Sequence, residues 1–327
     1  MTRSKIPAFF RKDHRIGNSP DARGGYGKPF LKWVGGKTQL AEEILRTFPR
    51  EFFDERGMTY VEPFVGGGAI LFRLLRERAN VARAVVNDVN PALVATYRRV
   101  KNAPDALVAA LAELEREYLE LPETGEARRE FFLARRSEFN AATAGVPASE
   151  LECAERVPAL LIFLNRTCFN GLFRVNARGE FNVPFGKYKN PKICDEATIR
   201  ADSALLRNTE ILCGDFAKTL DYARGGNALF YLDPPYKPLS ATSSFNAYAQ
   251  GGFDDAEQTR LRDFCRELDA RGAKFVLSNS DARDAAGTSF FDELYADFNV
   301  RRVYASRMVN ADSSKRGKLA EVLISNF

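Results

Sequence analysis

The chain has 327 residues, with 48 Lys and Arg against 43 Asp and Glu for a formal net charge of +5, and 45% of its residues are hydrophobic. This composition is typical of a soluble globular protein and argues against a disordered chain. The length suffices for one large or two ordinary domains. No stretch approaches the roughly 20 apolar residues that a membrane helix needs. The first 15 residues lack the apolar core of a signal peptide, so we expect a cytoplasmic protein.

Cysteine and histidine are too sparse to carry several kinds of chemistry. The five cysteines form no CxxC pair and are odd in number, so neither a disulfide framework nor a structural zinc site is expected. His14 is the single histidine and lies in a polar leader, which argues against histidine-based catalysis. We therefore expect chemistry that needs neither a structural metal nor an imidazole.

The charge is unevenly distributed along the chain. Residues 1–28 hold seven basic and two acidic residues, which equals the net charge of the whole chain, so the remainder sums to zero. Within that remainder, 160–192 and 300–318 each carry six basic residues and one acidic residue, whereas 105–155 carries five basic and twelve acidic. Such blocks indicate a basic face for a polyanion, with ordinary solvated surface as the alternative interpretation.

The first part of the chain is typical of the start of an open α/β sheet. Residues 1–28 show no sustained periodicity and are interpreted as a flexible basic arm. A short strand ends at 60–64, a glycine loop follows, and an apolar face with helical spacing covers 70–75. The β-branched run 82–86 then leads to Asp88. This order of strand, glycine loop, helix, strand and acid predicts the first βαβ unit of such a sheet.

The middle of the chain differs in character. Residues 96–160 are rich in Ala, Leu, Glu and Arg with helical period, and a polar, aromatic segment follows at 166–191. Strand-like runs return at 211–213, 228–232, 274–277 and 319–324. The sequence therefore predicts an α/β domain that is split by a mainly helical insertion. The predicted parts are an arm at 1–28, a catalytic domain at 29–95 plus 208–327, and an inserted domain at 96–207.

Asp233-Pro234-Pro235-Tyr236 directly follows the apolar run 228–232. Ligands of open α/β sheets bind beyond the carboxyl ends of the strands, so these residues are expected to face a site. The two prolines fix the backbone and leave carbonyls free to accept hydrogen bonds. Asp233 and the Pro234 carbonyl can accept both hydrogens of an exocyclic amine, and the ring of Tyr236 can stack on a base. A strand-ending turn with Tyr236 in the core is the alternative.

Two other segments combine glycines with functional residue types. The loop 62–69 contains three successive glycines but fits neither G-x-G-x-x-G nor a P-loop. Glycine there lets the backbone approach a ligand, and Asp88 lies about 20 residues on, the usual position for a carboxylate that binds ribose hydroxyls. The segment 30–37 holds the only tryptophan, Trp33, near a Gly-Gly turn between two lysines. This suits a pocket for an amino-acid carboxylate and a nucleoside, or a core tryptophan beside a surface loop.

Taken in order, these segments resemble the Dam-type DNA N6-adenine methyltransferases, the D12 class of the α group. The resemblance covers 29–327 and leaves only the arm outside. It implies a Rossmann-like, S-adenosylmethionine-dependent methyltransferase sheet, with the insertion as a target-recognition domain that carries a DNA-reading β-hairpin. It rests on FLKWVGGK at 30–37, EPFVGGGA at 62–69, NDVN at 87–90, FNGLFRVNARGEFNVPFGKYKNP at 169–191, CGDF at 213–216 and DPPY at 233–236.

The resemblance implies S-adenosylmethionine as the cofactor, S-adenosylhomocysteine as its product, and no metal. The methyl group would pass directly to the target amine, so no enzyme nucleophile is needed. The implied catalytic residues are Asp233, Pro234 and Tyr236. The implied cofactor-binding residues are Trp33, Lys37, Phe64, Gly66, Gly68, Asp88, Asp215, Phe216 and again Asp233.

The resemblance also implies that the target adenine is flipped out of the duplex, at a cost of roughly a few kcal/mol. The segment 169–189 alternates aromatic residues with Arg and Asn in a ribbon that can enter a DNA groove. Arg174 can bind a guanine in bidentate fashion, and likeness to GATC-reading members makes GATC the expected target. The implied DNA-binding residues are Lys32, Phe169, Asn170, Leu172, Arg174, Pro184 and Tyr188.

Other functions are compatible with the same motifs. A DPPY site also serves cytosine N4, RNA adenine or protein amides, and the scaffold would suit a non-catalytic DNA-binding regulator. Intact Asp88, Asp233 and Tyr236 argue against the regulator. Double-stranded DNA is the expected partner, and a cognate restriction endonuclease is a further candidate. We expect a monomer in the cytoplasm, associated with the nucleoid and not with a membrane.

Overall fold

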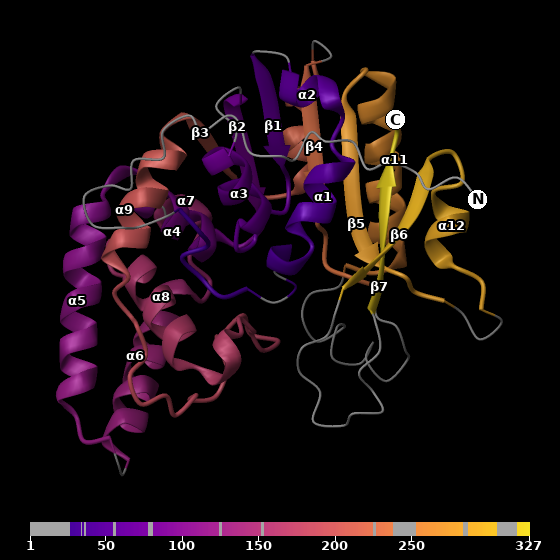
Figure 1. Ribbon diagram of the computed structural model, residues 1–327. Coiled ribbons are helices and arrows are strands. Elements are labelled where there is room, and N and C mark those ends of the chain that lie inside the picture. The colour runs from indigo at the N-terminus through magenta and orange to yellow at the C-terminus, as the bar shows by residue number, and fades with distance from the viewer. Residues whose placement is uncertain are drawn as a thin grey trace, which may run out of the picture.

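The computed structural model describes residues 27–33, 35, 37–54, 57–77, 81–123, 126–151, 154–224, 227–237, 253–283, 287–305 and 319–327. Within them, seven strands form one sheet in the order β3-β2-β1-β4-β5-β7-β6 (Figure 1). Neighbouring strands among β1 to β5 are parallel, and β7 is antiparallel to both β5 and β6. The strands are β1 (Met58–Glu62), β2 (Val81–Asp88), β3 (Thr209–Cys213), β4 (Ala228–Leu232), β5 (Lys274–Ser280), β6 (Asn299–Ala305) and β7 (Leu319–Ser325).

The central strands are buried on both faces. All five residues of β4 are buried, which suits a parallel strand covered by helices on both sides. Side chains alternate along a strand, and Tyr60 and Tyr231 accordingly join one core, whereas Val61 and Phe230 join another. The sheet therefore separates two hydrophobic cores and gives the strand ends a rigid support.

Helices cover both faces of the sheet (Figure 1). The core that contains Val61 and Phe230 lies on one face, and the helices of that face contribute Phe216, Leu261, Phe264 and Phe291 to it. The helices on the face that holds Tyr60 and Tyr231 are η2 (Lys37–Gln39), α1 (Ala41–Thr47), α2 (Arg50–Asp54), α3 (Ala69–Glu77) and α4 (Pro91–Asn102). Those on the opposite face are η5 (Phe216–Ala223), α11 (Asp255–Ala270) and α12 (Phe290–Leu294).

A helical segment lies between β2 and β3 in the chain and to the side of β3 in space (Figure 1). Its centre is α8, in which every residue but Arg166 is buried, and which contacts α4, α5 and α6. Because this segment shares one core with the sheet, its division into a separate domain at 96–207 stays a prediction. Its members are α5 (Pro104–Glu120), α6 (Ala127–Thr143), α7 (Ala148–Leu151), α8 (Val157–Thr167), η3 (Phe169–Gly171), α9 (Glu196–Leu205) and η4 (Leu206–Asn208).

The segment 168–189 turns back on itself without regular strands. Isolated antiparallel bridges join Cys168 to Phe185 and Val175 to Phe181, and the amide of Asn176 donates to the carbonyl of Glu180 at 2.9 Å. The predicted β-hairpin is therefore not confirmed as a regular ladder in the part of the chain described.

Some predictions fall outside the described residues. The arm is one, apart from Gly27 and Lys28, and 306–318 of the basic C-terminal block is another. Among the helices that are described, none is long and apolar enough to cross a membrane.

Candidate active site

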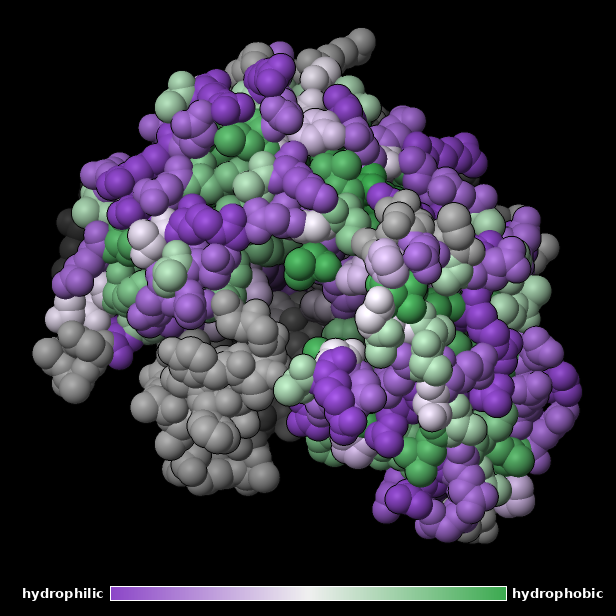
Figure 2. Space-filling view, turned by 180° about the vertical axis from the view of Figure 1, so that it is seen from behind, coloured by the Kyte–Doolittle hydropathy of each residue, from purple (hydrophilic) through white to green (hydrophobic). Residues whose placement is uncertain are grey.

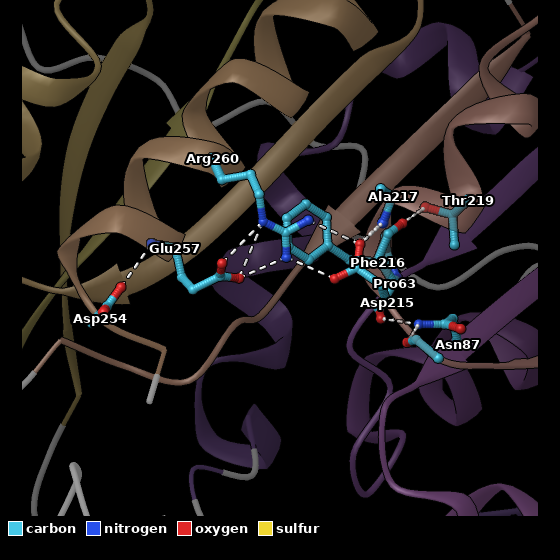
Figure 3. Close-up of polar contacts among 10 residues, drawn as sticks. Pro63, Asn87, Asp215, Phe216, Ala217, Thr219, Asp254, Glu257 and Arg260 are labelled. Atoms are coloured by element: carbon cyan, nitrogen blue, oxygen red, sulfur yellow. Dashed lines mark hydrogen bonds and ion pairs between the residues drawn. The ribbon is translucent and has the colours of Figure 1, made fainter. Parts of the chain in front are cut away.

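Three loops at the carboxyl edge of the sheet are tied together by one side chain. Asn87, near the end of β2, donates from Nδ2 to the carbonyls of Pro63 at 3.0 Å and Gly214 at 2.8 Å (Figure 3). The main-chain carbonyl of Asn87 accepts from the Val65 amide at 2.9 Å. The loops after β1, β2 and β3 are thereby held side by side, at the edge where parallel sheets bind ligands.

The Asp88 side chain is hydrogen-bonded to the glycine loop. Its Oδ2 accepts from the Gly66 amide at 3.0 Å, and its Oδ1 accepts from the Asn90 amide at 2.9 Å. Burial raises the pKa of Asp88, and these amide hydrogen bonds oppose the rise. Gly66 and Gly68 have φ angles of 47° and 70°, in the left-handed region that glycine adopts without strain. The loop thus presents backbone and a carboxylate at one place.

Trp33 packs directly against this loop. A Cβ atom at Gly66 would lie 2.8 Å from Trp33 Cδ1, and one at Gly67 would lie 2.8 Å from Trp33 Cβ. The partly buried indole also stacks on Phe173, with centroids 5.4 Å apart and 17° between the ring planes. The successive glycines therefore serve the approach of Trp33.

Asp233 lies just beyond β4 and is held by two donors. Lys37 Nζ is 3.0 Å from Asp233 Oδ1, and Ser278 Oγ donates to the same oxygen at 3.0 Å. Lys37 is only 4% exposed and also donates to the Gly35 carbonyl at 2.8 Å. Burial raises the pKa of Asp233, while Lys37 and Ser278 lower it. Both donors use Oδ1, and no hydrogen bond from the described residues reaches Oδ2.

Both the ring and the hydroxyl of Tyr236 are held by neighbouring side chains. Lys37 Nζ lies 4.3 Å from the ring centroid, and the hydroxyl donates to Glu321 Oε2 at 2.6 Å. Burial raises the pKa of Glu321, while the Lys37 charge and the Tyr236 hydrogen bond lower it. Burial also raises the pKa of Tyr236 well above its ordinary value, so the phenol stays protonated and donates.

Glu62, the last residue of β1, adds a further carboxyl group. It is 2% exposed and accepts from the Tyr60 hydroxyl at 2.9 Å. Its pKa is raised well above the ordinary value, first by burial and also by the charge of Asp233. Burial of Glu62 next to Asp233 thus disfavours two ionised carboxylates side by side in this part of the site.

Asp215 and Phe216 are both engaged by Arg260 of α11 (Figure 3). The guanidinium donates to the two carboxylate oxygens of Asp215 at 2.9 and 2.7 Å, and its centre lies 4.1 Å from the Phe216 ring centroid. The hydrogen bonds from Arg260 are the main reason that the pKa of Asp215 is lowered. Phe216 also packs against Phe64, with centroids 5.3 Å apart.

The residues expected to contact DNA gather on the segment 168–189 and on Lys32. Phe169 is 50% exposed, and Asn170 adopts a positive φ of 54°. The Asn170 amide donates to the Tyr188 hydroxyl at 3.0 Å, and Lys32 Nζ lies 5.2 Å from the Tyr188 ring centroid. The exposed Arg174 donates from Nε to Asn182 Oδ1 at 2.7 Å.

The remaining two residues of this group differ in exposure. Leu172 is partly buried, whereas Pro184 is exposed and its carbonyl accepts from the Phe169 amide at 2.8 Å. Figure 2 shows a hollow in the molecular surface between the sheet with its helices and the helical segment.

The profile that describes D12 class N6 adenine-specific DNA methyltransferases matches residues 33–309. The chain belongs to this class. It is 46% identical over 302 residues to the Type II methyltransferase M.MjaIII of Methanocaldococcus jannaschii, covering 92% of this chain and 99% of that protein. It is 39% identical to M1.LlaDCHI of Lactococcus lactis subsp. cremoris, covering 92% and 95%. It is 34% identical to the DNA adenine methylase of Escherichia coli strain K12, covering 90% and 94%.

As a D12-class enzyme, the chain is an adenine-N6 DNA methyltransferase, and this class uses S-adenosylmethionine. The residues at the carboxyl edge fit that cofactor. Asp88, an acceptor that suits ribose hydroxyl groups, lies beside the backbone of the glycine loop and accepts from the Gly66 amide. Carboxyl groups with raised pKa values at Asp233 and Glu321 suit a cationic ligand, because a positive charge favours their ionised forms.

Several residues of this D12-class site were not predicted from the sequence. Glu62 was readable as an acid at the end of a strand. Ser278, Glu321 and Arg260 had no local signal, because each reaches the site from a distant segment. In the described residues, no group of three or more His, Cys, Asp or Glu side chains is placed to hold a metal ion.

Proposed function

We propose that the enzyme methylates N6 of an adenine flipped out of GATC in double-stranded DNA. The observation that carries this proposal is the arrangement beyond β4, where Asp233 is paired with Lys37 at 3.0 Å. Beside it, the ring of Tyr236 is fixed by Glu321 at 2.6 Å. A carboxylate, rigid carbonyls and an aromatic face are the groups needed to hold a base by its exocyclic amine.

Asp233 and Pro234 are the acceptors that we propose for the two amine hydrogens. Asp233 Oδ2 is free of the donors that hold Oδ1, and the carbonyl of Pro234 belongs to a backbone that two prolines make rigid. Accepting both hydrogens concentrates the lone pair on the amine nitrogen, which is the attacking atom. The Tyr236 ring stacks on the base, a contact of about 1–3 kcal/mol.

S-adenosylmethionine, when bound, supplies the activated methyl group. Asp88 would bind the ribose hydroxyls, and the backbone at Gly66 and Gly68 would lie close to the ligand. Trp33 packs against Gly66 and Gly67 of the same loop, and Lys37 is paired with the Asp233 carboxylate. Phe64, Asp215 and Phe216 would surround the adenine, with Asp215 as acceptor for its amine.

The segment 168–189 is the proposed reader of the target sequence. Phe169 and Asn170 are exposed on a turn with a positive φ, which suits side chains that fill the space of a flipped base. Arg174 would bind a guanine, and Leu172 and Pro184 would contact a thymine methyl group. Lys32 and Tyr188 would contribute further DNA contacts next to this turn.

Adenine methylation is supported by relatives that are named DNA adenine methylases, and we propose GATC from the likeness of this segment to GATC-reading members of the family. Those relatives include the proteins of Escherichia coli at 34% identity and of Haemophilus influenzae at 32%. The two relatives with higher identity are named Type II methyltransferases, which supports a restriction endonuclease as a partner. We further propose that 96–207 acts as the target-recognition domain and that the enzyme acts as a monomer.

A protection assay tests the proposal. Unmethylated plasmid incubated with enzyme and S-adenosylmethionine should resist an endonuclease that cleaves only unmethylated GATC. Asp233→Asn should reduce the rate of methyl transfer at least about 100-fold while duplex binding is retained, because the amine loses its charged acceptor. Sequencing of the modified bases identifies the context, and methylation confined to another sequence would refute GATC.

A further inference from the structure

The segment that carries Lys32 and Trp33 lies between the glycine loop and the turn at 169–173. On the cofactor side, the indole of Trp33 lies so close to Gly66 and Gly67 that neither position has room for a Cβ atom. On the DNA side, the same indole stacks on Phe173 at 5.4 Å. One side chain therefore touches both of the proposed ligand sites.

Asn165 of α8 makes a second connection between the same two regions. Its Oδ1 accepts from the Lys32 amide at 2.9 Å, and its Nδ2 donates to the Lys32 carbonyl at 2.8 Å and the Gly171 carbonyl at 2.9 Å. The side chain is 2% exposed. Both amide hydrogens are thus used, so Lys32 cannot shift without disturbing Gly171 or breaking a buried hydrogen bond.

Close packing adds to these hydrogen bonds. Gly171 has a φ of 63°, and a Cβ atom there would lie 2.5 Å from Lys32 Cδ. The adjacent Asn170 is bonded through its amide to Tyr188, whose ring faces Lys32 Nζ. The turn that presents Phe169 and Asn170 is therefore packed on the segment that carries Trp33.

We propose that Asn165 and Phe173 are positioning residues that couple the binding of cofactor to the binding of DNA. The inference rests on the proposed function, because it takes the glycine loop as the cofactor site and 168–189 as the DNA site. Because Trp33 packs on both the glycine loop and Phe173, and Asn165 bonds both Lys32 and Gly171, a ligand that fixes the position of Trp33 also fixes the turn at 169–173 for the second ligand. By linkage, each ligand must raise the affinity for the other by the same factor.

The test measures that factor with the full-length enzyme. The dissociation constant of S-adenosylhomocysteine is determined by calorimetry with and without a saturating GATC duplex, and Trp33 fluorescence gives a second readout. We expect DNA to tighten S-adenosylhomocysteine binding by about fivefold or more in the natural enzyme. Phe173→Leu and Asn165→Asp should each bring the factor close to one.

Asn140→Asp is the matched control. Asn140 holds Phe181 of the same segment by an equivalent pair of bonds, at 3.1 Å to its carbonyl and 2.8 Å from its amide. It has no bond to Lys32 or to Gly171, and Phe181 reaches the coupling residues only through a tilted ring contact with Phe173 at 5.7 Å. This variant should therefore weaken DNA binding and change the coupling factor much less than Phe173→Leu or Asn165→Asp. Should Asn165→Asp fail to fold, Phe173→Leu decides the matter alone.

Two results would overturn the inference: a factor of one in the natural enzyme, or an unchanged factor in folded Phe173→Leu and Asn165→Asp. A natural enzyme that binds neither S-adenosylhomocysteine nor DNA would instead refute the proposed function. The two failures are therefore distinguishable in one set of titrations.

Discussion

Tyr236, which follows β4, depends for its orientation on a carboxyl group of β7, two strands away in the sheet. Its hydroxyl donates to Glu321 at 2.6 Å, and the two residues are 85 positions apart in the chain. Lys37 lies against the ring and against Asp233, so one cation contacts both groups that would hold the target base. Each of these side chains is therefore held by another, and the loss of one leaves a buried polar group of its partner without a hydrogen bond or ion pair.

Tyr236→Phe isolates the hydroxyl from the ring. The ring remains for stacking, but Glu321 loses its donor, and an unsatisfied buried polar group costs about 1–3 kcal/mol. We expect the single-turnover rate of methyl transfer to fall roughly tenfold or more. Tyr222→Phe is the control, because Tyr222 donates to Glu210 at the same 2.6 Å distance outside this site. Equal rates in the two variants would argue against positioning by Glu321.

The pH dependence of transfer should report Asp233. Only the ionised carboxylate attracts the amine hydrogens strongly, so the rate should fall as the pH drops through the pKa of Asp233. Burial raises that pKa, which places the acid limb above the value of about 3.9 for an ordinary Asp. Lys37 lowers the pKa, so Lys37→Met should move the limb to higher pH. Lys274→Met, which alters a surface pair with Glu51, should leave the limb in place in the same single-turnover profile.

Helix α11 supports the site from the opposite face of the sheet. Gln258 donates to the Pro235 carbonyl at 3.3 Å, and Arg260 holds Asp215 with two hydrogen bonds. Asp254 is the N-cap of this helix, and its side chain accepts from the Glu257 amide. Glu257 in turn pairs with Arg260 (Figure 3). The start of one helix therefore fixes an acid that follows a different strand.

Arg260→Met should weaken the binding of S-adenosylhomocysteine. Without the guanidinium, Asp215 loses the hydrogen bonds that lower its pKa and fix its orientation, so it is a poorer acceptor for an adenine amine. A loss of about 0.5–1.5 kcal/mol corresponds to a roughly two- to thirteenfold higher dissociation constant, measured by calorimetry. Arg266, which also lies on α11, forms a comparable pair with Asp297. The Arg266→Met variant should therefore bind S-adenosylhomocysteine with the affinity of the natural enzyme. The same affinity in both variants would remove Arg260 from the site.

The segment 168–189 illustrates how an irregular element is held without a β-ladder. Buried side chains from the helices supply the missing partners: Arg128 donates to the Lys189 carbonyl at 2.7 Å, and Tyr118 donates to the Tyr188 carbonyl at 3.3 Å. Backbone groups of buried segments need partners, and helices α5 and α6 provide them here. The alternation of aromatic and polar residues predicted a regular ribbon because local pattern does not contain these distant donors.

For the molecule as a whole, the predicted basic arm lies outside residues 33–309, which match the family. Its last residue is anchored, since the Lys28 amide donates to Asp202 Oδ1 at 3.0 Å and Lys28 Nζ lies 3.6 Å from Asp195. The arm therefore joins the enzyme at α9, in the helical segment.

Deleting residues 1–26, which keeps Lys28, should weaken duplex binding and flatten its salt dependence without changing the target sequence. Each arm residue that contacts a phosphate contributes about 0.9 to the slope of log K against log salt. Binding titrations at several salt concentrations measure the slope, and methylation of GATC and of variant duplexes checks the target. A changed target after deletion would contradict a purely electrostatic arm.

The positions of most strands followed from the sequence, because burial on both faces leaves continuous apolar runs. The predicted runs at 211–213, 228–232 and 274–277 all lie within strands of the sheet. β6 was not predicted, since its adjacent arginines resembled basic surface. Arg302 is in fact paired with Asp281 and Asp292, whereas Arg301 donates to the Thr47 hydroxyl at 2.8 Å. These different partners account for two like charges side by side in an edge strand.

The sequence by itself determined the family, the order of the motifs and the acids that follow β2, β3 and β4. These features are local, because residue type, periodicity and spacing act within a few positions of one another. Only the tertiary structure decided that Glu321 holds Tyr236, that Arg260 holds Asp215 and that Asn165 joins Lys32 to Gly171. Those contacts span 85, 45 and 133 positions in the chain. They exist because strand order and helix packing, which no local pattern encodes, bring the segments together.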